Sequence, residues 1–150
     1  MKRLASNGTS VSTSRELTVL AAGKSRPYSV GVKLLLENLP PSLADQRETL
    51  ARCLEAMDRV IPLKLVYLFG SHARGEARPD SDVDLCLVAE GATEQLKAAQ
   101  KFRRAMSDVW PRPSFTLIPI APGRLDEKKA VGDHFFHTVL KEGVLLASEN

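Results

Sequence analysis

The chain has 150 residues, of which 43% are hydrophobic and 26% charged, as is ordinary for one globular domain. No apolar stretch approaches the ~20 residues that a membrane-spanning helix needs. The two cysteines, Cys53 and Cys86, stand in apolar segments rather than in paired or metal-type spacings. These features argue against a membrane span and a disulfide framework, and they predict a cytoplasmic protein with buried free thiols.

Charge is distributed unevenly along the chain. Residues 1–33 contain six Lys/Arg and one acid, whereas the rest contains fifteen Lys/Arg and seventeen Asp/Glu. A domain that grips a long polynucleotide usually presents a basic stripe to the phosphates. The slightly acidic body therefore argues against long nucleic acid as the substrate.

The first 33 residues are rich in Ser, Thr, Gly and Asn without a sustained period, which predicts a disordered basic tail before a domain spanning 34–150. A transit peptide or a nucleic-acid tether is the alternative for this segment. We expect order to begin near Ser42, because Ser42-Leu43-Ala44-Asp45 has the form of a helix cap. Apolar residues at helical spacing then predict a buried face: Leu43, Leu50, Leu54, Met57 and Ile61.

Strands and helices alternate after this helix. The run 63–69 is apolar and bounded by Pro and Gly, which predicts a buried strand, and 83–88 alternates as a strand with two distinct faces. Thr93 is a predicted cap for a helix with the apolar side Leu96, Ala99, Phe102, Met106 and Val109. A strand at 115–120, a helix opened by Pro122 and a strand at 143–146 complete an α/β (α+β) domain, with helices packed on a small mixed sheet.

A glycine and a small hydroxyl follow the first predicted strand. Gly70 allows backbone amides and the Ser71 hydroxyl to approach an anion closely. Gly-Ser after a strand is more often a plain turn. Taken together with the two aspartates at the next strand, however, this pair is a candidate phosphate seat.

The two aspartates stand two residues apart. Side chains at that spacing project from one face, so Asp82 and Asp84 repel each other unless a cation lies between them. Hard oxygen ligands suit Mg²⁺ shared with substrate phosphates. Asp-x-Asp alone also occurs on solvated strand edges, but its conjunction with Gly-Ser predicts phosphoryl or nucleotidyl transfer.

The segment from Gly70-Ser71 through ten residues to Asp82-x-Asp84 resembles the signature of the polymerase-beta-like nucleotidyltransferase superfamily. With Arg74-Gly75 and Ser81, it is most similar to the minimal nucleotidyltransferases (MNT domains) of bacteria and archaea. The resemblance implies that Gly70 and Ser71 hold the triphosphate of a nucleotide such as ATP, and that Asp82 and Asp84 bind two catalytic Mg²⁺ ions.

Other polar residues of the motif are weaker candidates. Arg74 is a candidate phosphate ligand and is equally consistent with a helix surface, and Ser81 either contacts nucleotide or caps the turn before the strand. We expect His72 at the surface. For His134 and His137 we favour packing or surface placement over a metal pair, and for Trp110 a position against the core.

The sequence departs from the family pattern on the third strand. Active relatives usually carry a third carboxylate there, and Thr116 occupies the expected place. A threonine hydroxyl cannot act as a carboxylate at neutral pH. The motif therefore supports metal and nucleotide binding more firmly than turnover.

Three functions remain open. The first is transfer of a nucleoside monophosphate to a protein or small molecule; relatives of this size often pair with a HEPN-domain toxin as its antitoxin. The second is a nucleotide-binding module that acts through protein association. The third is nucleotidylation of a small molecule, as in aminoglycoside-modifying relatives, which usually need a further helical domain. A homo-oligomer is one way in which a second subunit could supply missing parts of the site.

Overall fold

The computed structural model describes residues 31–149, in which Val32–Glu149 form one compact unit. The predicted tail lies outside the described residues except for its last three positions. The chain already packs well before Ser42, since Leu36 is buried and a short strand at Lys33–Leu34 pairs with the last strand. The expected start of order was therefore wrong, because so short a strand carries no readable period.

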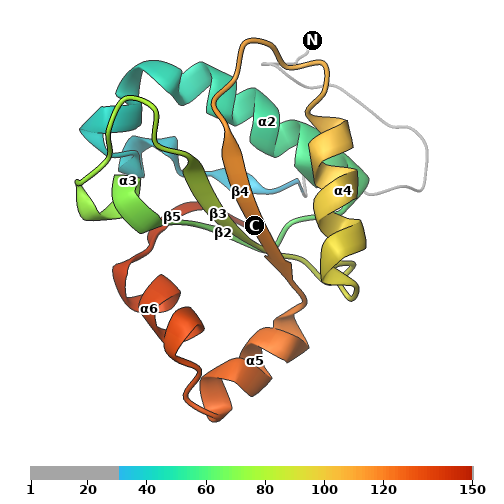
Figure 1. Ribbon diagram of the computed structural model, residues 1–150. Helices are drawn as coiled ribbons and strands as arrows, with labels where there is room; N and C mark the ends of the chain where they lie inside the picture. Colours follow the sequence, from blue (N-terminus) through green and yellow to red (C-terminus); the bar gives the residue numbers. More distant parts are fainter. Residues whose placement is uncertain (1–30, 150) are drawn as a thin grey trace, which may run out of the picture. The chain divides into compact units, whose positions relative to one another are not determined.

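The sheet has five strands in the order β1-β5-β2-β3-β4 (Figure 1). Their bounds are β1 Lys33–Leu34, β2 Leu65–Phe69, β3 Val83–Val88, β4 Phe115–Ile120 and β5 Val144–Ser148. β3 and β4 are parallel and the other neighbours antiparallel. This mixed sheet with helices packed on it confirms the predicted fold class.

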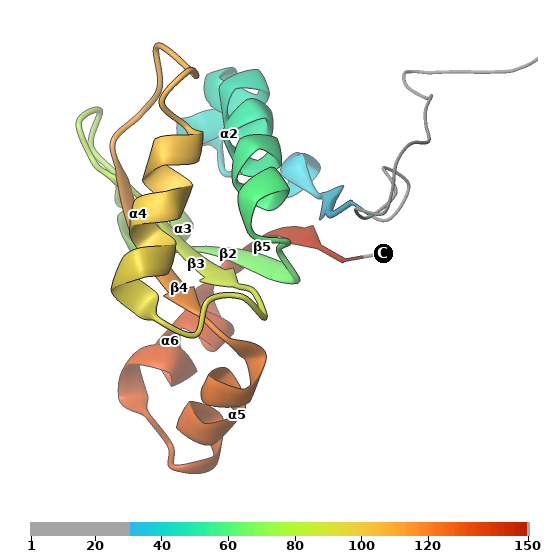
Figure 2. The same cartoon turned by 90° about the vertical axis from the view of Figure 1, so that its right-hand side faces the viewer.

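Helices cover both faces of this sheet. The α-helices are α2 Arg47–Val60, α3 Gly70–Arg74, α4 Gln95–Ala105, α5 Pro122–Ala130 and α6 His134–Glu142, and two 3-10 helices, η3 Leu36–Asn38 and η4 Pro41–Gln46, precede them. α2 and α4 pack on one face, while α5 and α6 lie on the other (Figure 2). The two faces therefore have separate cores.

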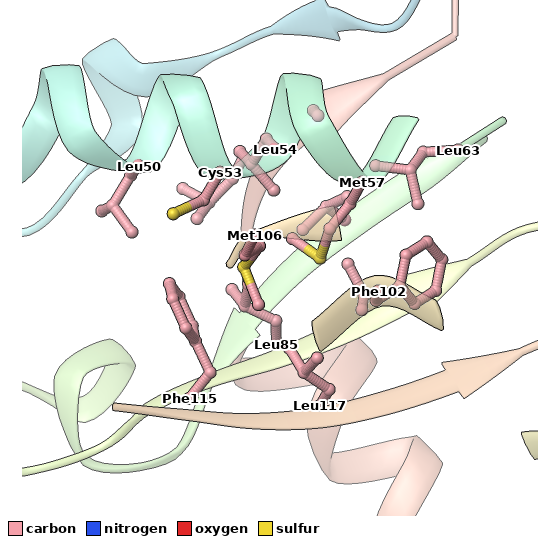
Figure 3. Packing of buried hydrophobic residues seen from close by; sticks show 14 of the residues in the cluster. Leu50, Cys53, Leu54, Met57, Leu63, Leu85, Phe102, Met106, Phe115 and Leu117 are labelled. Atoms are coloured by element: carbon pink, nitrogen blue, oxygen red, sulfur yellow. The ribbon is translucent and has the colours of Figure 1, made fainter. Parts of the chain in front are cut away.

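The larger core lies between α2, α4 and the sheet (Figure 3). All five residues of the predicted helix face are buried in it: Leu43, Leu50, Leu54, Met57 and Ile61. They meet inward side chains of β3 and β4 such as Leu85 and Leu117. Burial of each leucine stabilises the fold by about 1.5–3 kcal/mol relative to exposure.

The smaller core lies under α5 and α6. Its buried residues are Cys86, Val88, Ile120, Leu125, Phe136 and Val139. Since Val83, Leu85 and Leu87 face the other core, β3 has the two distinct faces predicted for it. Both cysteines are buried and free, as expected, and burial raises the pKa of the Cys86 thiol to about 12.

Two predicted helix caps were wrong. Ser42 lies inside η4, because Pro41 starts that turn before α2 begins, and no side chain caps α2. α4 begins after Glu94, also without a side-chain cap, so Thr93 does not serve it. Leu96 is exposed and Ala98 is buried, so the inward face of α4 begins two residues later than predicted.

Trp110 is 76% exposed, so the predicted position against the core was wrong. α4 ends at Ala105, and Val109 occupies the last buried position before the Pro-rich turn. The next residue therefore points to solvent.

Within residues 31–149, the helices are all too short or too polar to cross a bilayer.

Candidate functional site

The end of β2 and the starts of β3 and β4 meet at one end of the sheet. Phe69, the last residue of β2, is opposite Asp84 of β3, and Asp84 is in turn the partner of Thr116 in β4. The register thus aligns three side chains across three adjacent strands. Gly70 directly follows Phe69 and lies at the same place.

This cluster belongs to the face of the sheet that carries α5 and α6. Asp84 alternates with Cys86 and Val88, which both pack under those helices. Asp82, two residues before Asp84 and one before the strand, falls on the same side by alternation. Its charge raises the pKa of Asp84, so the two carboxylates lie within electrostatic reach of each other.

The environment of Asp84 disfavours its charged form. Partial burial is the main cause of its raised pKa, and Asp82 adds to it. A hydrogen bond with the Thr116 side chain and the nearby His72 and Arg74 side chains act in the opposite direction without cancelling it. A half-buried carboxylate that repels a second one is an environment that a divalent cation would stabilise.

Gly70 lies directly against Asp84. Its φ of 78° is in the left-handed region, and a Cβ built on it would collide with the Asp84 carboxylate. Both observations require glycine at this position. The close approach brings the backbone of the Gly70-Ser71 turn beside the aspartate pair.

α3 returns the chain from this turn to β3. It is a single helical turn with half-buried Ser71 near its start, and it ends at Gly75, where φ is 74°. The backbone N–H of Glu76 donates to the Ser71 carbonyl at 2.9 Å and closes the turn. The predicted phosphate seat is therefore a defined turn adjoining Asp84.

Arg74 and Ser81 make local contacts. Arg74 Nε donates to Glu76 Oε1 at 3.0 Å on the surface. The Ser81 hydroxyl accepts from the backbone N–H of Arg78 at 2.8 Å, so Ser81 caps the turn before the strand. Neither contact is buried, so either side chain can exchange it for a ligand.

His72 is buried, with 5% of its surface exposed, and the expectation of a surface residue was wrong. Nδ1 lies 2.8 Å from the Ser42 hydroxyl, and Nε2 lies 3.4 Å from the Ser81 carbonyl. A carbonyl only accepts, so Nε2 donates, and in the neutral ring Nδ1 accepts from Ser42. His72 thereby links η4 to the residue before Asp82, a long-range contact that no local sequence pattern indicates.

The donor set can be tested against Mg²⁺. Mg²⁺ typically takes one or two carboxylates and completes its shell with water and substrate phosphate oxygens. Asp82 and Asp84 supply that number, with Thr116 beside them. Residues 31–149 contain no cluster of three or more His, Cys, Asp or Glu residues that could hold a metal ion.

His134 and His137 are both exposed on α6, in agreement with the surface placement that we favoured over a metal pair.

Comparison with known proteins assigns the family. The sequence model described as the nucleotidyltransferase domain matches residues 49–130, which is more than half of the chain. The chain belongs to the nucleotidyltransferase domain family. The matched span of this nucleotidyltransferase domain runs from α2 to the end of α5 and includes every residue of the cluster at the sheet end.

One solved structure resembles this nucleotidyltransferase domain. It is the crystal structure of a candidate nucleotidyltransferase from Sulfolobus solfataricus, with 25% sequence identity and a TM-score of 0.49, and the match covers 69% of this chain and 81% of that one. A search of curated proteins gave no significant match.

Proposed function

We propose that this chain is a Mg²⁺-dependent nucleotidyltransferase that moves a nucleoside monophosphate, AMP from ATP in the first instance, to a hydroxyl of a protein or small molecule. The observation that carries the proposal is the juxtaposition of Gly70 with Asp84, next to Asp82. It brings a candidate phosphate-binding turn and a candidate metal-binding pair together in a chain of this family.

Each residue of the cluster would have its own task. The Gly70-Ser71 turn would receive the triphosphate through its backbone amides and the Ser71 hydroxyl, and Arg74 would exchange Glu76 for a phosphate oxygen. Asp82 and Asp84 would hold the metal and so fix the α-phosphorus relative to the acceptor. Bound Mg²⁺ would neutralise the triphosphate and stabilise the charge of the departing pyrophosphate.

A second function is favoured by Thr116. The residue paired with Asp84 carries a hydroxyl where a third acid would complete the site of a transferase. Without that acid, deprotonation of the acceptor loses its nearest base. The alternative is thus a nucleotide-binding module with little turnover that acts by protein association.

The proposed partner is a HEPN-type protein, with the nucleotidyltransferase acting as the antitoxin of the pair. This proposal rests on the resemblance of the segment from Gly70-Ser71 to Asp84 to the minimal nucleotidyltransferases, which often pair with such a toxin. The acceptor hydroxyl would then be a residue of the partner.

The test is incubation with Mg-ATP and candidate acceptors, followed by mass spectrometry of every species. A gain of one nucleoside monophosphate on an acceptor is expected from the enzyme, and no gain despite measurable Mg-ATP binding from the binding module. The matched control is the double variant Asp82→Asn, Asp84→Asn, which keeps side-chain size and loses both charges. Unchanged calorimetric binding of Mg-ATP by this variant would exclude the site.

A further inference from the structure

Phe135, at the start of α6, is an exposed ring in contact with Phe69, the residue before Gly70. Its exposed fraction is 42%, whereas its neighbour Phe136 is buried in the smaller core. Scattered surface hydrophobics need no explanation in themselves. What distinguishes Phe135 from exposed residues such as Leu96 is the pair of rings that hold it.

Phe135 is fixed by edge-to-face contacts on two sides. Its centroid lies 5.5 Å from that of Phe69 with planes at 89°, and 5.0 Å from that of Phe136 with planes at 82°. Such geometry is favourable for aromatic pairs and restrains the ring. Side-chain order is thus established before any ligand binds, although much of the ring faces solvent.

The contact with Phe69 connects this ring to the catalytic cluster. Phe69 is the cross-strand partner of Asp84 and directly precedes Gly70. Partners in an antiparallel pair have Cβ atoms about 5 Å apart on one face. Phe135 is therefore one side chain away from both the proposed metal pair and the proposed phosphate seat.

We propose that Phe135 is a stacking platform for the base of the bound nucleotide; this rests on the proposed function. With the triphosphate on Gly70-Ser71, the nucleoside can extend over Phe69 and Phe135 or over β4. The β4 side presents the Thr116 hydroxyl, which suits a polar acceptor. Stacking on a flat, restrained aromatic ring contributes binding free energy to a base, and it does so for every base because each has a π-face.

The experiment compares two ligands on one variant. Calorimetry with Phe135→Ala should show Mg-ATP affinity reduced about 5- to 150-fold, while the affinity for Mg-tripolyphosphate, which has no base, stays unchanged. Phe135→Trp should retain or strengthen ATP binding. Leu96→Ala, which truncates an exposed apolar residue of α4 on the other side of the sheet, should alter neither ligand.

Other outcomes overturn the assignment. Unchanged ATP affinity in Phe135→Ala would show that the base does not use this ring. An equal loss for ATP and tripolyphosphate would show that the ring only supports the phosphate turn. If the wild-type protein bound neither ligand, the proposed function itself would fail, and this result differs from both others.

Discussion

Gly70 combines two demands in one residue, a left-handed backbone and the absence of a Cβ next to Asp84. A side chain in that backbone region costs about 1–2 kcal/mol. Gly75, at the other end of α3, has a similar φ of 74°, but nothing lies within 4 Å of a Cβ built on it. A side chain at Gly75 would therefore cause backbone strain alone, whereas a side chain at Gly70 would cause both backbone strain and a collision with Asp84.

We predict that Gly70→Ala loses more stability than Gly75→Ala and also loses Mg-ATP binding. Gly75→Ala should lower the free energy of unfolding by about 1–2 kcal/mol, from the backbone alone. Gly70→Ala must add the displacement of Asp84. Chemical denaturation and calorimetric titration measure both effects, and equal behaviour of the two variants would contradict the close approach.

Thr116 offers a way to add the missing acid. Thr116→Asp places a third carboxylate beside Asp84, because the two positions are register partners. Without Mg²⁺ the extra charge should lower the melting temperature, since Asp84 is already repelled by Asp82. Mg²⁺ should reverse this loss, and any weak transferase activity should rise.

Thr116→Asn is the control for this substitution, because it has the shape of aspartate without the charge. It should show neither the Mg²⁺-dependent recovery in melting temperature nor the gain in activity. A folded Thr116→Asp protein with unchanged activity would argue that this position does not adjoin the reacting groups.

The residue scale also marks where the sequence is insufficient. The Gly-Ser and Asp-x-Asp pairs could be read locally, since a turn and a two-residue repeat are local geometries. The burial of His72 could not, because its partner Ser42 is 30 positions away. The motif therefore predicts which site residues lie close together, but not the long-range hydrogen bonds that hold them in place.

At the scale of elements, α6 depends on Asp133. Its carboxylate accepts from the backbone N–H of Phe136 at 3.0 Å and caps the helix that carries Phe135. This hydrogen bond is the main reason that the pKa of Asp133 lies below its usual value, with Lys128 adding to it. The cap therefore stabilises the folded state in its charged form.

The sign of the pH effect follows from that lowered pKa. Stability from Asp133 is fully present above the unfolded value, near 4, and is lost as pH falls through the folded value. We expect Asp133→Ala to melt below wild type at pH 7, with the gap closing at lower pH. Asp133→Asn, which retains a capping oxygen, should instead keep a pH-independent difference from Asp133→Ala.

Melting curves from pH 7 to pH 3 would check this prediction. A gap between wild type and Asp133→Ala that stays constant across the range would contradict the capping role of the charged group.

Elements differ in how well the sequence predicts them. β4 at 115–120 and the Pro122 start of α5 were predicted at their observed bounds, because prolines and apolar alternation delimit them. The start of α2 was not, because η4 absorbs the apparent capping motif at Ser42. The start of a helix near two adjacent prolines depends on how the turn packs against the rest of the fold. The spacing of residues in the sequence does not show this packing.

At the scale of the described unit, the two faces of the sheet have unequal support. The core under α2 and α4 draws on most of the buried residues, whereas the core under α5 and α6 has six. Regions with little buried apolar area open at lower free energy. The candidate site lies on the face with the smaller core, so we expect α5 and α6 to adjust to a ligand more readily than α2 and α4.

We predict that amides of α5 and α6 exchange with solvent by openings of lower free energy than those of β2 and β3. Leu54→Ala, in the larger core, should lower protection across the whole unit by about 2–5 kcal/mol. Phe136→Ala should act mainly on α5 and α6, because it removes a ring from the smaller core. Hydrogen exchange resolved by residue distinguishes these patterns. Uniform exchange on both faces of the sheet would show that the two cores open together.

The same measurement with and without Mg-ATP tests the ligand. Bound nucleotide should protect the amides at the start of α6, where Phe135 contacts Phe69.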